Sequence, residues 1–122
     1  MKYMALIYTD PASWDSVPEE ERKAIYQRYL DLTEEARASG VYVGAAQLGS
    51  TGDATTVRIR DAETLVTDGP YAEVKEALGG YYLFDCASLD EALDWAAKIP
   101  AAARGAVEVR ALYVDEEGGQ AA

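Results

Sequence analysis

Both faces of the first predicted strand are apolar, and this feature most restricts the folds open to the chain. Residues 2–9 form a short run of strand-forming side chains that ends at Asp10-Pro11. Successive side chains of a strand point to opposite sides of a sheet. Here one side carries Tyr3, Ala5 and Ile7, and the other carries Met4, Leu6 and Tyr8. We therefore expect this strand to lie in a sheet that needs cover on both faces.

A helical pattern follows over residues 17–39. Ser16 and Glu19 have the spacing of a capping box, and Pro18 is tolerated in a first helical turn. Gly40 is a typical residue just beyond the end of a helix. One apolar stripe, which predicts the side that packs on the sheet, consists of Ile25, Tyr29, Leu32 and Ala36.

The rest of the chain predicts further strands and a second helix. Residues 41–45 have the composition of a strand, and the segments before and after Asp61-Ala62 alternate as a hairpin over 55–60 and 63–67. Residues 81–86 predict a buried strand, and residues 106–114 predict a final, alternating one. Between these strands a second capping box, Ser88 to Glu91, starts a helix with the stripe Leu89, Ala92, Leu93 and Ala96.

This order of elements predicts an α+β fold of the ferredoxin-like, split βαβ type with an inserted β-hairpin. A length of 122 residues suits one domain, which we place at residues 1–114, followed by an acidic, flexible tail at 115–122. Two helices can cover only one face of the sheet. Face-to-face packing of two copies in a homodimer would cover the other face.

The charge and the missing residue types exclude several classes of function. Acidic residues number 22 against 11 basic ones, so the net charge is −11 and we expect no nucleic-acid partner. The chain has no histidine and only one cysteine, Cys86, so we expect neither a metal nor another cofactor. The N-terminus shows neither a signal peptide nor a membrane-spanning run, which predicts a cytoplasmic protein without a membrane partner.

Several ordered motifs resemble one known family. They lie at residues 1–4, 6–8, 54–58, 65–73, 75–83, 89–96 and 107–110. At these positions the chain resembles the YCII-related family, and within it the subgroup named for an Asp-Gly-Pro-Phe (DGPF) motif, here Asp68 to Tyr71. The resemblance implies a dimeric α+β barrel, in which two ferredoxin-like sheets pack face to face.

The chain also departs from the pattern of that family. One branch is thought to use a His/Asp pair in catalysis, and this chain has no histidine for it. Tyr71 replaces the phenylalanine of the motif, and Ala46 stands near the place where a glutamate is expected. Some members of the subgroup are encoded beside extracytoplasmic-function sigma factors. The resemblance therefore implies a fold and suggests a sigma-factor link, but it does not supply an activity.

Asp68 is the candidate catalytic residue. At the rim of a cavity between the sheet and the dimer mate, a partly desolvated carboxylate with a raised pKa can act as a general acid or base. The alternative is a rigid turn in which the Asp68 carboxylate accepts a backbone hydrogen bond, Gly69 adopts a positive φ and Pro70 fixes the next φ. The sequence leaves both interpretations open.

The candidate ligand-binding residues are Tyr8, Tyr71, Lys75, Tyr82 and Arg110. A tyrosine hydroxyl in a cleft can donate a hydrogen bond to a ligand, and a cationic side chain selects an anionic ligand. Each residue type also has a structural alternative: core packing for the tyrosines, cross-strand ion pairing for the arginine and a solvated charged segment for the lysine.

Two functions are consistent with these features. The first is a homodimer that binds a small organic molecule in the cavity between sheet and dimer mate, with acid–base chemistry of the isomerase or lyase type that needs no histidine. The second is a non-catalytic regulatory or interaction protein, with a sigma factor as a candidate partner. A pocket with converging polar side chains would favour the first function, and an exposed apolar patch would favour the second.

Overall fold

The chain forms two antiparallel sheets, a larger one that packs against the helices and a smaller one that stands apart from them. The computed structural model describes residues 1–113, so the predicted tail at 115–122 lies outside the described residues. The larger sheet has the strand order β2-β5-β1-β6, and the smaller one is a separate hairpin of β3 and β4. The strands are β1 (Lys2–Thr9), β2 (Tyr42–Gln47), β3 (Thr55–Arg60), β4 (Glu63–Asp68), β5 (Ala77–Asp85) and β6 (Ala106–Ala111).

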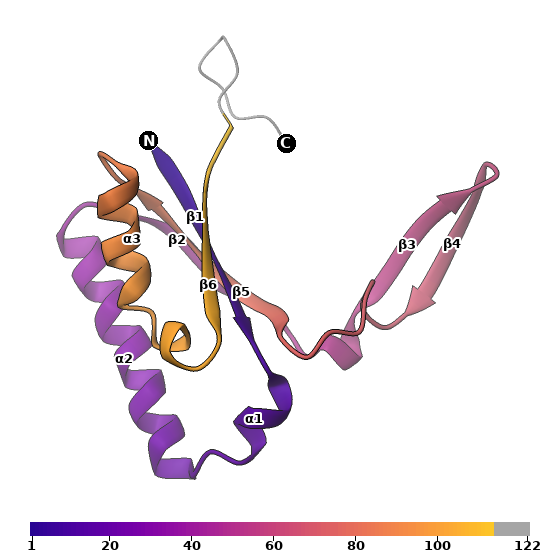
Figure 1. Ribbon diagram of the computed structural model, residues 1–122, viewed down its shortest axis with the longest axis horizontal. Coiled ribbons are helices and arrows are strands. Elements are labelled where there is room, and N and C mark those ends of the chain that lie inside the picture. Colours follow the sequence, from indigo (N-terminus) through magenta and orange to yellow (C-terminus); the bar gives the residue numbers. More distant parts are fainter. Residues whose placement is uncertain (114–122) are drawn as a thin grey trace.

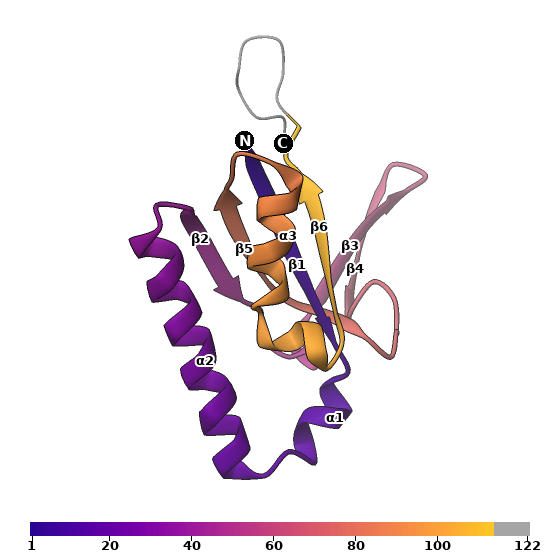
Figure 2. The same ribbon diagram turned by 60° about the vertical axis from the view of Figure 1, so that its left-hand side comes forward.

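The helices lie on one side of the four-stranded sheet, as Figures 1 and 2 show. They are α1 (Pro11–Asp15), α2 (Glu19–Ala38) and α3 (Leu89–Ala97), with the 3₁₀ turns η1 (Thr51–Asp53) and η2 (Pro100–Ala103). The α+β, ferredoxin-like fold with an inserted hairpin is therefore confirmed. No helix within residues 1–113 combines the length and the apolar character that crossing a membrane requires.

The core lies between the helices and one face of the sheet. Tyr3, Ala5 and Ile7 of β1 are buried there, as the alternation of the sequence predicts. Tyr82 and Phe84 of β5 pair with Ala5 and Tyr3, so they lie on the same face. Their rings continue a row of aromatic side chains: Tyr82 stacks on Phe84 at 5.4 Å between centroids, and Phe84 lies 6.0 Å from Trp95 of α3.

The first long helix starts later than the sequence predicts. α2 buries Ile25, Leu32 and Ala36, which confirms the predicted stripe. The capping box at Ser16 is wrong, because Pro18 occupies the N-cap without a side-chain hydrogen bond and the Ser16 hydroxyl donates instead to the carbonyl of Ser13. The preceding turn is itself helical: the Asp10 carboxylate accepts a hydrogen bond from the amide of Ala12 and caps α1.

The second capping box is confirmed. Ser88 Oγ accepts a hydrogen bond from the amide of Glu91, and a carboxylate oxygen of Glu91 accepts one from the amide of Ala87. The predicted stripe of this helix is only half right, because Leu89 and Leu93 are exposed. Trp95 occupies the core against Phe84, and the buried side of α3 therefore consists of Ala92, Trp95 and Ala96.

The opposite side of the sheet has no helix on it. We call this side the open face and define it by Met4, Leu6, Tyr8, Tyr81, Leu83, Glu108 and Arg110, which share one side by strand alternation and register. The five apolar and aromatic residues are half-buried by their neighbours, whereas Glu108 and Arg110 are exposed. The charged pair thus lies beside an apolar strip.

The β3–β4 hairpin projects from one end of the sheet, on the side of the open face (Figure 1). Its two-residue turn is the predicted Asp61-Ala62, and both residues have positive φ values, 53° and 64°. These angles are typical of a type I′ turn, whose twist matches that of the strands. The chain enters and leaves the hairpin side by side, since the amide of Gly69 donates to the carbonyl of Ala54 at 2.6 Å.

Candidate functional site

A cleft of about 870 Å³ opens between the helices and one end of the sheet. Its walls come from the end of β1, α1, the first half of α2, the end of β2 with the loop after it, the start of β5 and the turn η2. The side chains that give it chemical character include Asp10, Ser13, Trp14, Asp15, Tyr26, Tyr29, Gln47, Tyr82 and Arg104. A volume of this size lies within the range of about 300–1,000 Å³ that is usual for small-molecule sites.

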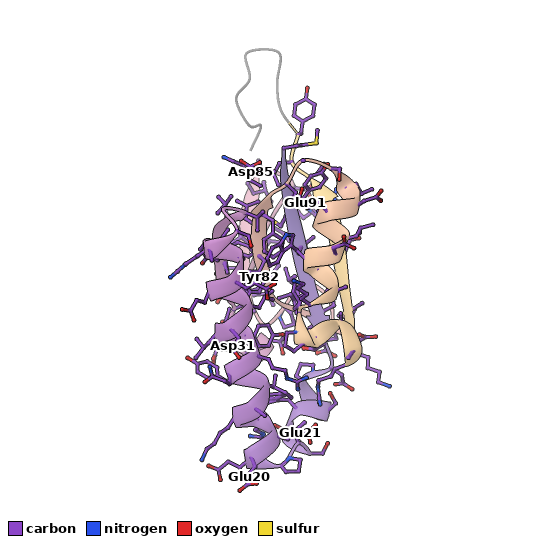
Figure 3. All side chains as sticks on the ribbon, turned by 90° about the vertical axis from the view of Figure 1, so that its left-hand side faces the viewer. Glu20, Glu21, Asp31, Tyr82, Asp85 and Glu91 are labelled. Carbon is purple, nitrogen blue, oxygen red and sulfur yellow. The ribbon has the colours of Figure 1, made fainter. Side chains whose placement is uncertain are left out.

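Two stacked tyrosines form the inner wall of the cleft. The rings of Tyr29 on α2 and Tyr82 on β5 are nearly parallel, with 6.5 Å between their centroids. The hydroxyl of Tyr82 lies 2.9 Å from Thr33 Oγ1 and 3.4 Å from the carbonyl oxygen of Tyr29. Figure 3 shows Tyr82 between α2 and α3, where α2 supplies these partners. The hydroxyl of Tyr82 is therefore already held by the protein.

Burial shifts the acidity of both tyrosines. Desolvation raises the pKa of Tyr29 above its ordinary value, opposed by a backbone hydrogen bond at Ala101 and by the positive charge of Arg104. Desolvation also raises the pKa of Tyr82, opposed by its hydrogen bond with Thr33. Both phenols thus keep their protons at neutral pH, and Tyr29 can act at the cleft as a neutral hydrogen-bonding group.

Arg104, which directly follows η2, brings a positive charge to the cleft. Its guanidinium carbon lies 5.7 Å from the ring centroid of Trp14, and that of Arg22 lies 5.4 Å from the same ring. Arg22 is fixed by hydrogen bonds from its side chain to the carbonyls of Trp14 and Val17. Among the described lining residues, Arg104 is the only cationic side chain. The cleft therefore combines one guanidinium with aromatic walls.

The floor of the cleft depends on a close approach of two strands. A Cβ at Gly80 would lie 2.6 Å from the carbonyl oxygen of Ala46, so a side chain at this position does not fit between β5 and β2. Gly80 lies opposite Ile7 on β1 and beside Gln47 on β2. The missing side chain leaves room on the helix side of the sheet, next to Tyr82.

A family comparison fits this fold and covers every residue that the structure describes. The model of the YCII-related domain matches residues 1–114. The chain belongs to the YCII-related family. It is also 38% identical over 120 residues to an uncharacterised protein from Rhizobium meliloti (strain 1021), an alignment that spans 97% of each chain.

In this YCII-related protein, the six residues singled out from the sequence lie in three separate places. Tyr82 lies at the cleft, on the helix side of the sheet. Tyr8 and Arg110 lie on the open face, and Arg110 is exposed. Asp68, Tyr71 and Lys75 are exposed at the end of the hairpin and in the segment that leads to β5. The structure does not bring these residues together in one site.

The turn after Asp68 is stabilised by Gly69 and Thr56, and not by the hydrogen bond to the Asp68 carboxylate that the sequence suggested. Gly69 has a φ of 105°, as expected, and its carbonyl accepts a hydrogen bond from the hydroxyl of Thr56 at 2.8 Å. Two residues after Asp68 stands Pro70, which has no amide hydrogen to donate to a carboxylate. Asp68 lines neither the large cleft nor a second, smaller cavity of about 280 Å³ beside this segment.

Tyr71 follows the turn and interacts with the hairpin. The guanidinium carbon of Arg58 lies 4.7 Å from the centroid of its ring, a cation–π contact between β3 and the segment after β4. The ring of Tyr71 nevertheless remains 73% exposed.

Sequence reasoning missed Arg104 and Trp14 as site residues. Trp14 lies in α1, which the sequence indicated only as the turn after the first strand, and Arg104 follows η2, which the sequence did not predict. Tyr29 was expected on the sheet-facing stripe of α2, and that stripe continues into the cleft. The position of Tyr29 on this stripe was therefore the one signal in the sequence that could have indicated the cleft.

Within residues 1–113, no three acidic or cysteine side chains gather as a metal site would need. The thiol of Cys86 is buried, and burial raises its pKa, with the carboxylates of Glu91 and Asp85 adding to the effect. A thiol in such surroundings is a poor nucleophile. Cys86 therefore belongs to the core and not to the cleft.

Proposed function

We propose that this YCII-related protein binds a small organic molecule that carries an anionic group, with one ligand in the cleft of each subunit of a homodimer. The observation that carries the proposal is the pairing of one guanidinium, Arg104, with aromatic walls in a cleft of about 870 Å³. A cavity lined by aromatic side chains with a few polar groups is the usual composition of a small-molecule site.

The charge of Arg104 defines the chemical class of the ligand. A guanidinium binds a carboxylate or a phosphate in a bidentate manner, and Arg104 offers this group in a cleft that Asp10 and Asp15 also line. Tyr26 is 64% exposed at this cleft, so it can contact the outer part of a ligand. Trp14 and Leu30 offer apolar contacts beside it.

The homodimer is proposed from the open face. Its apolar strip along β1 and β5 has no helix on it, whereas the equivalent residues of the other face form the core. Packing the strip against its copy removes this surface from water, at roughly 25 cal/mol for each Å² of apolar area. Tyr8 and Arg110 would then lie at the subunit interface.

Any acid–base chemistry in the cleft would have to use a tyrosine such as Tyr29 or the carboxylates of Asp10 and Asp15, because Asp68 does not line it. Asp10 Oδ1 accepts a hydrogen bond from the amide of Ala12, which uses part of the hydrogen-bonding capacity of this carboxylate. Tyr29, with its raised pKa, can donate a proton only to a strongly basic intermediate. This balance favours binding over turnover as the function of the cleft.

A thermal-shift experiment with small carboxylates tests the proposal. The purified protein is heated in the presence of a panel of aliphatic and aromatic carboxylates, alongside Arg104→Gln and Arg28→Gln. Arg28 is exposed on α2 and does not line the cleft, so Arg28→Gln removes the same charge at a position away from the proposed site. A ligand that binds the native state raises the melting temperature.

We expect at least one carboxylate to raise the melting temperature of the wild type and of Arg28→Gln, and to leave that of Arg104→Gln unchanged. A panel without any effect on the wild type would contradict an anion-binding cleft. Equal shifts in both variants would show that Arg104 is not the anchor.

A second candidate function is that of a non-catalytic interaction protein, such as one that acts with a sigma factor. The observation in its favour is the exposed apolar side of the hairpin, with Val57, Ile59 and Val66. A hairpin face that stays exposed in the purified homodimer would support this second function.

A further inference from the structure

The two sides of the β3–β4 hairpin have opposite character. Val57 pairs with Val66 and Ile59 pairs with Thr64, so these four residues share one side. The other side carries Arg58, Arg60, Glu63 and Thr67 together with Leu65. We call the side of Val57, Ile59 and Val66 the apolar arm face, since the hairpin stands away from the rest of the fold like an arm (Figure 1).

The apolar arm face is strongly exposed in the single chain. Val57, Ile59 and Val66 are exposed by 61%, 64% and 65%, in contrast to the half-buried residues of the open face. An isolated two-stranded hairpin is marginally stable in water, and it needs a further surface to be secure. Among the described residues, the chain itself therefore supplies no surface that packs on the apolar arm face.

The direction of the arm indicates what the partner is. The arm leaves the end of the sheet on the side of the open face, away from α2 and α3 (Figures 1 and 2). A second copy that packs on the open face would occupy the space on this side. The apolar arm face and the open face of one subunit can thus contact the same neighbouring molecule.

The size of the open face supports an additional contact. Four strands about 4.8 Å apart, with about six residues each at 3.3 Å, give a flat footprint of roughly 400 Å². A stable interface buries on the order of 800 Å² on each partner. The sheet contact alone is therefore a small interface, and it must also overcome the repulsion between two copies that each carry a charge of −11. Two arms would enlarge it symmetrically.

The charges of the open face are compatible with a second copy. Glu108 and Arg110 lie two residues apart on β6, on the same side of the sheet, and neither forms an ion pair within residues 1–113. A two-fold interface brings a patch against its own copy, so Glu108 can meet Arg110 of the partner subunit and the reverse. The face is thus self-complementary in charge.

We infer that the apolar arm face of each subunit docks on a second copy of this chain, so that two arms clasp the homodimer. This inference rests on the proposed homodimer and adds a second, separable contact to it. The occupant of the arm face is the neighbouring subunit, and the arm is the part of the interface that stands outside the ferredoxin-like core.

Two adjacent residues of β4 offer a matched test. Val66→Glu places a charge on the apolar arm face, and Thr67→Glu places the same charge on the other side of the same strand. In a third variant a Gly-Gly linker replaces residues 55–68, because the two ends of the arm already meet through the bond between Gly69 and Ala54. Sedimentation equilibrium gives the dimer dissociation constant of each variant, and circular dichroism checks its fold.

We expect Val66→Glu and the arm deletion to raise the dissociation constant about tenfold or more, and Thr67→Glu to change it by less than about twofold. A wild-type dimer whose dissociation constant is unchanged in Val66→Glu and in the deletion would overturn the arm contact and leave the homodimer standing. An equal loss in Thr67→Glu would also overturn it, as a general effect of charge. A wild type that stays monomeric would overturn the homodimer itself.

Discussion

The hydroxyl of Tyr82 lies 2.9 Å from Thr33 Oγ1, and this contact joins β5 to α2 at the inner wall of the cleft. The carbonyl oxygen of Tyr29 lies within reach of both hydroxyls, 3.0 Å from Thr33 Oγ1 and 3.4 Å from that of Tyr82, and either hydroxyl can donate in the contact between them. The tyrosine thereby orients one wall of the site without offering its hydroxyl to a ligand. Tyr29, stacked beside it, lines the cleft as well, together with the exposed Tyr26.

Tyr82→Phe removes this hydrogen bond and keeps the ring. Because Tyr82 is buried, we expect the free energy of unfolding to fall by about 1 kcal/mol. Tyr26→Phe removes an exposed hydroxyl from the same cleft and should change stability by less than about 0.5 kcal/mol. Urea denaturation of both variants measures the difference, and an equal effect would show that the Thr33 contact adds no stability.

The raised pKa of Tyr82 predicts a loss of stability in alkali. The unfolded chain releases this phenolic proton near the ordinary pKa of 10.0, whereas the folded chain keeps it to higher pH. Stability from this group is complete below pH 10 and is lost as the pH rises through the folded pKa. Denaturation series from pH 8 to pH 11 should therefore show a steeper decline in the wild type than in Tyr82→Phe. Parallel curves would mean that burial does not raise the pKa of Tyr82.

Gly105→Ala tests the close approach of β6 and β1. A Cβ at Gly105 would overlap the carbonyl oxygen of Tyr8 and come within 3.0 Å of a carboxylate oxygen of Glu76. Backbone must move to make room, so we expect a loss of about 1–3 kcal/mol in unfolding free energy. Gly49→Ala is the control, since a Cβ there meets no atom within 4 Å. Equal melting temperatures for the two variants would disprove the packing described here.

Asp68→Asn tests the role of the motif that dominated the sequence. The carboxylate is exposed and lines neither cavity, so we expect the variant to keep its melting temperature within about 2 °C and to respond to carboxylates like the wild type. Loss of the ligand-induced shift in a folded Asp68→Asn protein would return this residue to the site. The subunit arrangement would then have to bring Asp68 to the cleft of the partner.

The order of elements was predictable because apolar periodicity records burial. The strands, the hairpin turn at Asp61-Ala62 and the stripe of α2 all follow from patterns that a single segment carries. The capping box at Ser88 was predictable for the same reason. Local signals are sufficient where local bonds decide the structure.

The errors arise where contacts between distant segments decide. Trp95 takes the core position beside Phe84, and the exposure of Leu89 and Leu93 follows from that choice and not from the helical period. Ser16 matches a capping pattern, yet its hydroxyl is bound to Ser13 because α1 precedes it. No pattern within one segment specifies either outcome.

The cleft could not be predicted because its walls come from many separate elements along the chain. Trp14 and Arg104 lie 90 positions apart in the sequence, and only the fold brings them to one surface. The sequence drew attention instead to a compact motif, Asp68 to Tyr71, whose turn geometry depends on Gly69 and Thr56.

Native mass spectrometry of the freshly purified, untagged protein tests the central claim most directly. The account predicts a dimer that carries a small organic anion on each subunit, and the loss of this added mass in Arg104→Gln while Arg28→Gln keeps it. A wild-type spectrum with bare subunits only, unchanged by millimolar carboxylates, would contradict the proposed function of the cleft.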